Sequence, residues 1–200
     1  PGPRPPGCGA ARWVSHVPVS AADRQVAGHT DSRFMAAAVA LDGCLCPTAD
    51  DRSGLFFPFT TIGGITWLFS TLLEGCTTVM VEAFDPVTTP PILQREAVTL
   101  AGSGTTFHMA YLAAQRATPD TKYFENVRGF PGGGAPKPPQ LHYDLKNEVG
   151  GVGIISGYGL TEAPIIAMAS YLDTDEVLAE TEGGATRSVQ LRTVTLEGKV

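Results

Sequence analysis

The stretch SGYGLTE, which ends at Glu162, holds the residues best suited to chemistry. Gly157 and Gly159 flank Tyr158, so the ring can lie against an open surface and pack on a nucleotide base. Thr161 offers a hydroxyl to a phosphate oxygen. Glu162 offers a carboxylate to Mg²⁺, which proteins bind through one or two carboxylates together with substrate phosphates. The same residues would also suit a simple turn after a strand, with Glu162 in solvent.

A second glycine-rich stretch, GFPGGGAP, lies one predicted helix earlier. Gly132, Gly133 and Gly134 carry no Cβ, so their backbone can approach a flat ligand closely. Ala135 and Pro136 then form a small, stiff wall. Glycine and proline also favour an ordinary strand-to-helix turn, so this stretch alone does not separate a binding site from a turn.

Three further features carry weaker signals. Thr60 and Thr61 are polar residues in the apolar stretch FPFTTIGG, where packing at the edge of the core is the favoured interpretation. His108 lies off the apolar face of its predicted helix, and His142 lies beside Leu141 on another. Both histidines are therefore predicted to be surface or boundary residues rather than catalysts.

Composition limits the classes of partner. The chain has 200 residues, of which 43% are hydrophobic and 17% charged, as in a globular protein. Its net charge is −6 and it has no block rich in lysine or arginine, which argues against nucleic acid as a main partner.

Cysteine use and hydropathy indicate the compartment. The four cysteines form only one close pair, Cys44 and Cys46, which gives a zinc site little support and favours free thiols in a reducing compartment. No apolar run approaches the roughly 18 to 20 residues that span a bilayer. No signal peptide is visible, so a cytoplasmic location is expected.

Helical and strand patterns alternate from His29 onward, whereas residues 1–28 are rich in proline and glycine and are expected to be irregular or disordered. In residues 63–75, one apolar helical face is predicted to contain Ile65, Leu68, Phe69, Leu72 and Leu73. The remaining helices are predicted at 31–43, 90–96, 107–114 and 138–150, and the strands at 53–59, 77–81, 97–102, 127–131, 152–156 and 188–194. This alternation predicts an α/β fold with a mostly parallel sheet flanked by helices.

In open parallel sheets, ligands bind beyond the carboxyl ends of the strands. Three predicted connections lie at such ends, at residues 58–64, 132–136 and 157–162. The sequence therefore predicts that the two glycine-rich stretches and the threonine-containing loop meet at one site.

The order of these stretches resembles the adenylate-forming (AMP-dependent) synthetase/ligase superfamily, which includes acyl-CoA synthetases, luciferases and peptide-synthetase adenylation domains. FPFTTIGG, GGGAPKPPQL and GYGLTEAP are similar to the P-F-x-H-x-x-G, G-G-A-P-L and Y-G-x-T-E elements of acyl-CoA ligases. The resemblance covers residues 29 to about 196, and the acyl-CoA synthetase branch is the most similar. It implies that residues 29–200 are part of the large N-terminal domain, with the C-terminal subdomain absent.

This resemblance implies a two-step reaction of a small carboxylic acid with ATP and coenzyme A. The carboxylate attacks the α-phosphate to give an acyl-adenylate and pyrophosphate, and the thiol of coenzyme A then takes the acyl group. By position, the ATP or AMP contacts are Gly133, Gly134, Ala135, Pro136, Tyr158, Gly159 and Thr161. Glu162 would hold Mg²⁺ and act with Thr161 in catalysis. The acyl pocket would include Thr61, Gly63, Gly134 and Gly157.

The chain also departs from the family pattern. The Ser/Thr/Gly-rich phosphate loop that ends in P-K-G is replaced by HVPVSAADRQVAGHTD, in which Gly28 is the only glycine and lysine is missing. Thr61 stands where a histidine is common. The sequence ends at Val200, before the family's ribose-binding aspartate and the catalytic lysine of its C-terminal domain. We therefore expect a truncated, inactive portion of a ligase.

The abrupt change of composition suggests that residues 1–28 come from a shifted reading frame or a degenerate segment. Translation of the coding DNA in its other two frames tests this hypothesis, because neither frame should yield the phosphate loop if it is wrong. Two alternatives to an acyl-CoA ligase are a non-catalytic nucleotide-binding or scaffold remnant and an adenylation domain that loads a carrier protein. Phe57, Phe59 and Ile62 slightly favour a fatty, alicyclic or aromatic acid.

Overall fold

The computed structural model describes residues 11, 13–16, 26–187, 189–196 and 198. Residues 17–25, which hold most of the segment in place of the phosphate loop, lie outside the described residues. The reading-frame hypothesis for residues 1–28 stays a prediction. Among the described residues, no helix has the length and apolar character needed to cross a membrane.

The main sheet is mixed, with a parallel body and an antiparallel edge. Its strand order is β4-β3-β5-β6-β7-β8-β9, in which β5 and β6 are joined by parallel bridges from Leu100 to Gly129 and from Ser103 to Gly132. Pairing is parallel from β4 to β7 and antiparallel from β7 to β9. The strands are β3 (Arg52–Leu55), β4 (Thr77–Met80), β5 (Leu100–Gly102), β6 (Phe130–Gly133), β7 (Ile154–Leu160), β8 (Ala163–Met168) and β9 (Gly184–Ala185). The predicted α/β class with a mostly parallel sheet is confirmed.

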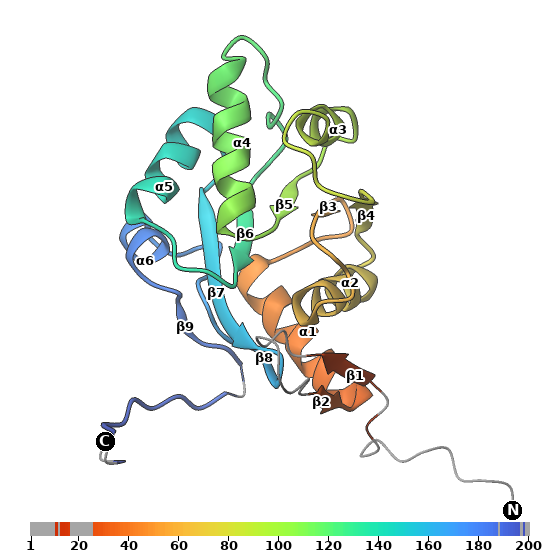
Figure 1. Cartoon of the computed structure of the whole chain (residues 1–200), viewed down its shortest axis with the longest axis vertical. Coiled ribbons are helices and arrows are strands. Elements are labelled where there is room, and N and C mark those ends of the chain that lie inside the picture. The colour runs from red at the N-terminus through yellow and green to blue at the C-terminus, as the bar shows by residue number, and fades with distance from the viewer. Residues whose placement is uncertain (1–10, 12, 17–25, 188, 197, 199–200) are drawn as a thin grey trace, which may run out of the picture.

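Helices cover both faces of this sheet (Figure 1). α1 and α2 pack together and against β8, whereas α4 packs on β6 and α5 packs on α4 and α6. The helices are α1 (Asp31–Leu45), α2 (Ile62–Glu74), α3 (Thr89–Arg95), α4 (Thr105–Ala117), α5 (Pro139–Asp144), which continues as a π-helical turn (Leu145–Val149), and α6 (Asp175–Glu180).

Consecutive strand residues supply two separate cores. Ala101 and Ile154 belong to the core under α4 and α5, while their neighbours Leu100 and Ile155 belong to the core under α1 and α2. Side chains alternate between the two faces of a strand, so a sheet covered on both faces needs continuous apolar runs such as these.

The first two helices start at threonine caps. The Thr30 side chain accepts a hydrogen bond from the Arg33 N–H and caps α1. α1 ends at Leu45 rather than near Gly43. α2 begins after Thr61, whose side chain accepts from the Gly64 N–H, and it stops at Gly75 as predicted.

The predicted apolar face of α2 is only partly buried, since Ile65, Leu68 and Phe69 are half-buried. Leu72 is 68% exposed and Leu73 43% exposed, whereas Thr66, Ser70 and Thr71 are buried. The buried hydroxyls are satisfied locally, because those of Thr66 and Thr71 donate to carbonyls of the same helix and that of Ser70 donates to Asp42 of α1. Once bonded in this way, these small side chains allow α1 and α2 to pack closely.

Two predictions about the ends of the chain are also wrong. β1 (Trp13–His16) pairs antiparallel with β2 (Val26–His29), so these residues within the stretch expected to be irregular form strands. The strand predicted at residues 188–194 does not form in its described part, 189–194, and the last strand is Gly184–Ala185.

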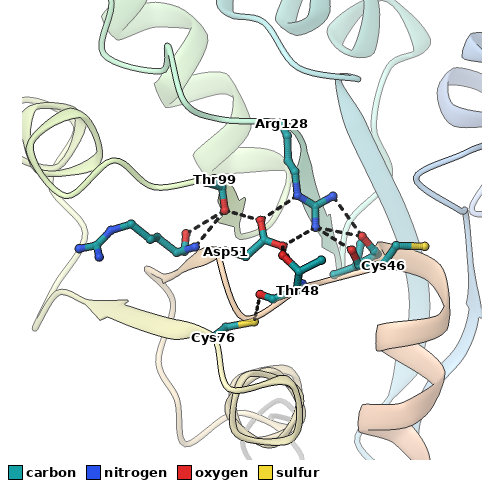
Figure 2. A network of polar contacts seen from close by, with 8 residues as sticks. Cys46, Thr48, Asp51, Cys76, Thr99 and Arg128 are labelled. Carbon is teal, nitrogen blue, oxygen red and sulfur yellow. Dashed lines mark hydrogen bonds and ion pairs between the residues drawn. The ribbon is translucent and has the colours of Figure 1, made fainter.

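A buried ion pair fastens the amino ends of the parallel strands (Figure 2). Asp51, just before β3, accepts hydrogen bonds from Thr99 at 2.6 Å and from the Nε and Nη2 of Arg128 at 2.8 and 3.0 Å. Arg128 also donates to the carbonyls of Leu45 and Cys46 at the end of α1. Burial raises the pKa of Asp51, but the hydrogen bonds from Arg128 and Thr99 outweigh it, so the net pKa lies below its usual value.

Candidate functional site

A cavity of about 340 Å³ opens at the carboxyl ends of β5, β6 and β7. It lies at the edge of the sheet where open parallel sheets bind their ligands. The predicted site residues that line it are Thr61, Gly63, Gly133, Gly134, Gly157, Tyr158 and Gly159. Ala135, Pro136, Thr161 and Glu162 are not among its lining residues.

The glycine turn forms one wall of this cavity. Gly133 belongs to β6, where a Cβ would overlap the carbonyl oxygen of Gly157 on β7, so no larger residue fits. Gly134 has φ +84°, which side-chain-bearing residues rarely adopt. Thr105, in the first turn of α4, donates to the Ala135 carbonyl at 3.0 Å and holds the turn in place.

The neighbouring wall is a β-hairpin rather than the predicted loop. β7 continues through Tyr158 to Leu160, turns at Thr161 and Glu162, and returns as β8. The register shifts between Tyr158 and Leu160, and Ile165 across the hairpin has φ +51°, a strained conformation for a β-branched residue. The buried Thr186 donates to the Ile165 carbonyl at 2.6 Å and supports this irregularity.

Tyr158 stands at the rim of the cavity with 51% of its surface exposed. Its ring can therefore pack on a planar ligand, as predicted from its two glycine neighbours.

Thr161 and Glu162 lie at the tip of the hairpin, beside β2. The Nε2 of the buried His29 hydrogen-bonds the Thr161 carbonyl at 2.8 Å and fixes the turn. Glu162 is exposed, and the described residues contain no group of three or more His, Cys, Asp or Glu side chains that could hold a metal ion. A single accessible carboxylate fits Mg²⁺ that is bound mainly by water and phosphate oxygens, and it does not fit a metal held by protein ligands alone.

Two helix N-termini add positive potential to the cavity. Ile62 and Gly63 of α2, and Gly104, which precedes α4, are lining residues. The first N–H groups of a helix have no intrahelical acceptor and attract anions. The cavity can therefore hold a negatively charged group although the chain as a whole is acidic.

Several lining residues were not predicted from the sequence. They include Ser103 and Phe107 around the start of α4, and also Leu41, Trp67 and Met168. The helical and strand patterns marked these residues only as core. A second, apolar cavity of about 880 Å³ adjoins the first, and Phe57 and Phe107 line both.

The surface assignment of two histidines is wrong. His108 is 1% exposed and His142 is fully buried. His142 accepts a hydrogen bond from the Ile154 N–H at 3.1 Å and so joins α5 to β7. Burial lowers the pKa of His108 to about 3, so its imidazole is neutral at physiological pH.

Comparisons with known proteins agree with this architecture. The AMP-binding enzyme family matches residues 27–200. Comparison with curated protein sequences finds no significant match. Three solved structures illustrate the likeness of fold.

One is the o-succinylbenzoate CoA synthetase MenE from Bacillus subtilis in complex with the acyl-adenylate OSB-AMP. Its sequence is 20% identical and its TM-score is 0.80, and the match covers 96% of this chain and 38% of that one. The same enzyme with ATP and magnesium has a TM-score of 0.81 at 20% identity, over 96% of this chain and 39% of that one. The N-terminal domain of FACL13 from Mycobacterium tuberculosis is 19% identical with a TM-score of 0.72, over 86% of this chain and 42% of that one.

The chain thus spans about two fifths of the length of these structures. The family match covers most of the chain, and the likeness to the solved structures is one of fold. The chain belongs to the AMP-binding enzyme family.

Proposed function

We propose that this chain is part of an AMP-forming acyl-CoA ligase, which converts a carboxylic acid, ATP and coenzyme A to acyl-CoA, AMP and pyrophosphate. The observation that carries the proposal is the meeting of Gly133, Gly134 and Tyr158 at one cavity with two helix N-termini. Flat, apolar and anion-attracting surfaces are thereby combined in one site, as an acyl-adenylate requires. Adenylyl transfer depends chiefly on positioning and charge stabilisation, which such a site supplies.

In this proposal, Tyr158 packs on the adenine and the backbone around Gly133 and Gly134 borders it from the adjacent strand. Ala135 and Pro136 act through the shape of the turn, because they do not line the cavity themselves. Thr61, Gly63 and Gly157 border the acyl group. The apolar lining by Phe57 and Ile62 favours a fatty, alicyclic or aromatic acid over a polar one.

Thr161 and Glu162 would face the phosphates at the tip of the hairpin. His29 lies on β2, within the segment that stands in place of the family's phosphate loop, and it contacts Thr161. This contact supports a phosphate site beside the hairpin. Glu162 would hold Mg²⁺, which neutralises phosphate charge when bound. ATP and magnesium are also the ligands of the MenE structure named above.

The acceptor is proposed to be coenzyme A rather than a carrier protein, because MenE is named as a CoA synthetase. The protein is proposed to act in the cytoplasm. The isolated chain is proposed to bind its ligands without completing the reaction, since its sequence lacks the P-K-G phosphate loop. The lost contacts would act on the transition state, so their absence falls on rate more than on binding.

Thermal-shift measurements with Mg-ATP and with a non-hydrolysable acyl-sulfamoyl adenosine test the proposal. We expect both ligands to raise the melting temperature, and the shift with Mg-ATP to depend on Mg²⁺. Glu162→Ala should abolish that Mg²⁺ dependence. Glu125→Ala removes another exposed glutamate, distant from Glu162 in the sequence, and should leave the Mg²⁺ dependence unchanged. If neither ligand shifts the wild-type protein, the chain is a scaffold remnant and the proposal is wrong.

A further inference from the structure

Four polar atoms lie buried beside the cavity without a partner. They are the Ser103 Oγ, both ring nitrogens of His108 and the Tyr111 hydroxyl, none of which makes a well-formed hydrogen bond to the residues that the structure describes, although the Tyr111 hydroxyl lies near Ser103 and the His108 ring lies near the backbone of Pro131. The three side chains are 5%, 1% and 0% exposed, respectively. Buried polar groups are hydrogen-bonded in the great majority of cases, so a cluster of this kind indicates a role beyond packing.

The cluster reaches the cavity through Ser103. Ser103 follows β5 directly and is a lining residue, whereas His108 and Tyr111 stand behind it on α4. A Cβ on Gly132 would meet both the Ser103 carbonyl and the His108 ring, so only glycine allows β6 to lie this close to them. The buried indole N–H of Trp67, another lining residue, also has no partner among the described residues.

The protonation states suit a neutral ligand group. Burial holds His108 neutral, and burial likewise raises the pKa of Tyr111 well above its usual value, against a smaller opposing effect of the nearby Ser103. A serine hydroxyl, a neutral imidazole and a phenol can each donate or accept, so together they match a group that does both. A ligand hydroxyl is such a group, whereas a carboxylate would add an unpaired buried charge.

We propose that Ser103 binds a hydroxyl group on the acyl chain of the carboxylic acid, with His108 and Tyr111 as positioning residues behind it. The substrate class would then be hydroxylated, otherwise apolar carboxylic acids. This inference rests on the proposed function, because it assigns the acyl group to this cavity. A site built to hydrogen-bond a substrate hydroxyl discriminates against the analogue that lacks it, since the polar groups of the protein are then left unpaired.

Isothermal titration calorimetry of the full chain tests the inference. The probes are acyl-sulfamoyl adenosines with an n-octanoyl chain, either unsubstituted or hydroxylated at successive carbons. We expect at least one hydroxylated probe to bind about tenfold more tightly than the parent, which is the effect of about one additional buried hydrogen bond. Ser103→Ala should remove this preference. Tyr111→Phe, which keeps the ring, should reduce the preference.

Ser53→Ala is the matched control, because Ser53 is buried in β3 and lines neither cavity. It should keep the full preference. If the parent probe binds and no hydroxylated probe binds better, the inference is wrong while the proposed function stands. Retention of the preference in Ser103→Ala would also overturn it. If no probe binds at all, the proposed function and the inference fall together.

Discussion

Replacement of Asp51 by alanine should destabilise the whole domain through the amino ends of its strands. The Asp51 side chain is 6% exposed and accepts hydrogen bonds from Arg128, from the Thr99 hydroxyl and from the Thr48 N–H. Its removal would leave the guanidinium without its carboxylate in a largely buried position. Arg128 also holds the end of α1, so the disturbance would reach the helix as well as the sheet.

Removal of one partner of a buried ion pair costs about 3 to 5 kcal/mol, because the remaining charge is uncompensated. The Arg128 side chain is 23% exposed, so water can solvate it partly and the lower value applies. We therefore expect Asp51→Ala to lower the free energy of unfolding by about 3 kcal/mol. Domains of this kind are stable by about 5 to 15 kcal/mol in total, so the loss should be easily measured.

Urea denaturation followed by circular dichroism measures this change, and a double-mutant cycle isolates the pair. The combined Asp51→Ala and Arg128→Ala variant should lose clearly less stability than the sum of the two single variants, because neither partner is then left unpaired. Asp120→Ala, at an exposed position, should change stability by less than about 0.5 kcal/mol. A loss below about 1 kcal/mol for Asp51→Ala, or additive single losses, would refute the reasoning.

Three further perturbations have defined outcomes. Burial raises the pKa of Asp42 to about 6, with Ser70 opposing it and Glu74 adding to it, so native Asp42 binds its proton more tightly than unfolded Asp42. The stabilising effect of protonated Asp42 is therefore lost as pH rises through 6. Asp42→Asn should raise the free energy of unfolding by about 1 kcal/mol at pH 7.5, after allowance for solvent screening, and should leave it unchanged at pH 3.5. Denaturant titrations at the two pH values measure this difference. Gly133→Ala should lower the free energy of unfolding by about 2 kcal/mol in the same assay and should abolish adenylate binding in calorimetry. The control Gly43→Ala should not be destabilised, because a Cβ at this position in α1 meets open space. Thr30→Ala removes the cap of α1 and should cost about 1 kcal/mol, and Thr30→Ser should restore most of it.

The architecture of the site could be predicted from the sequence because it depends on local patterns. The alternation of helices and strands fixed the carboxyl edge as the place where Gly133 and Tyr158 would meet, and the structure brings both to one cavity. Glycine spacing also identified Gly75 as the end of α2. These features need only neighbouring residues and the handedness of the chain.

The contribution of distant partners could not be predicted in this way. The exposed Leu72 and the buried Ser70 depart from the expected face of α2, because Ser70 is satisfied by Asp42 on another helix. His108 looks like a surface residue on a helical wheel, yet β6 lies directly over it. The hairpin after Tyr158 was missed because its pairing with β8 depends on a register shift that periodicity does not reveal.

Hydrogen–deuterium exchange with an acyl-sulfamoyl adenosine tests the central claim, that the cavity at the carboxyl ends of β5, β6 and β7 is an adenylate site. The account predicts slower exchange on binding in residues 132–134 and in the hairpin at 157–165, which form the two walls of the cavity. It predicts no change at the amino ends of the strands around Asp51 and Arg128. Protection confined to those ends, or no protection of either wall at saturating ligand, would contradict it.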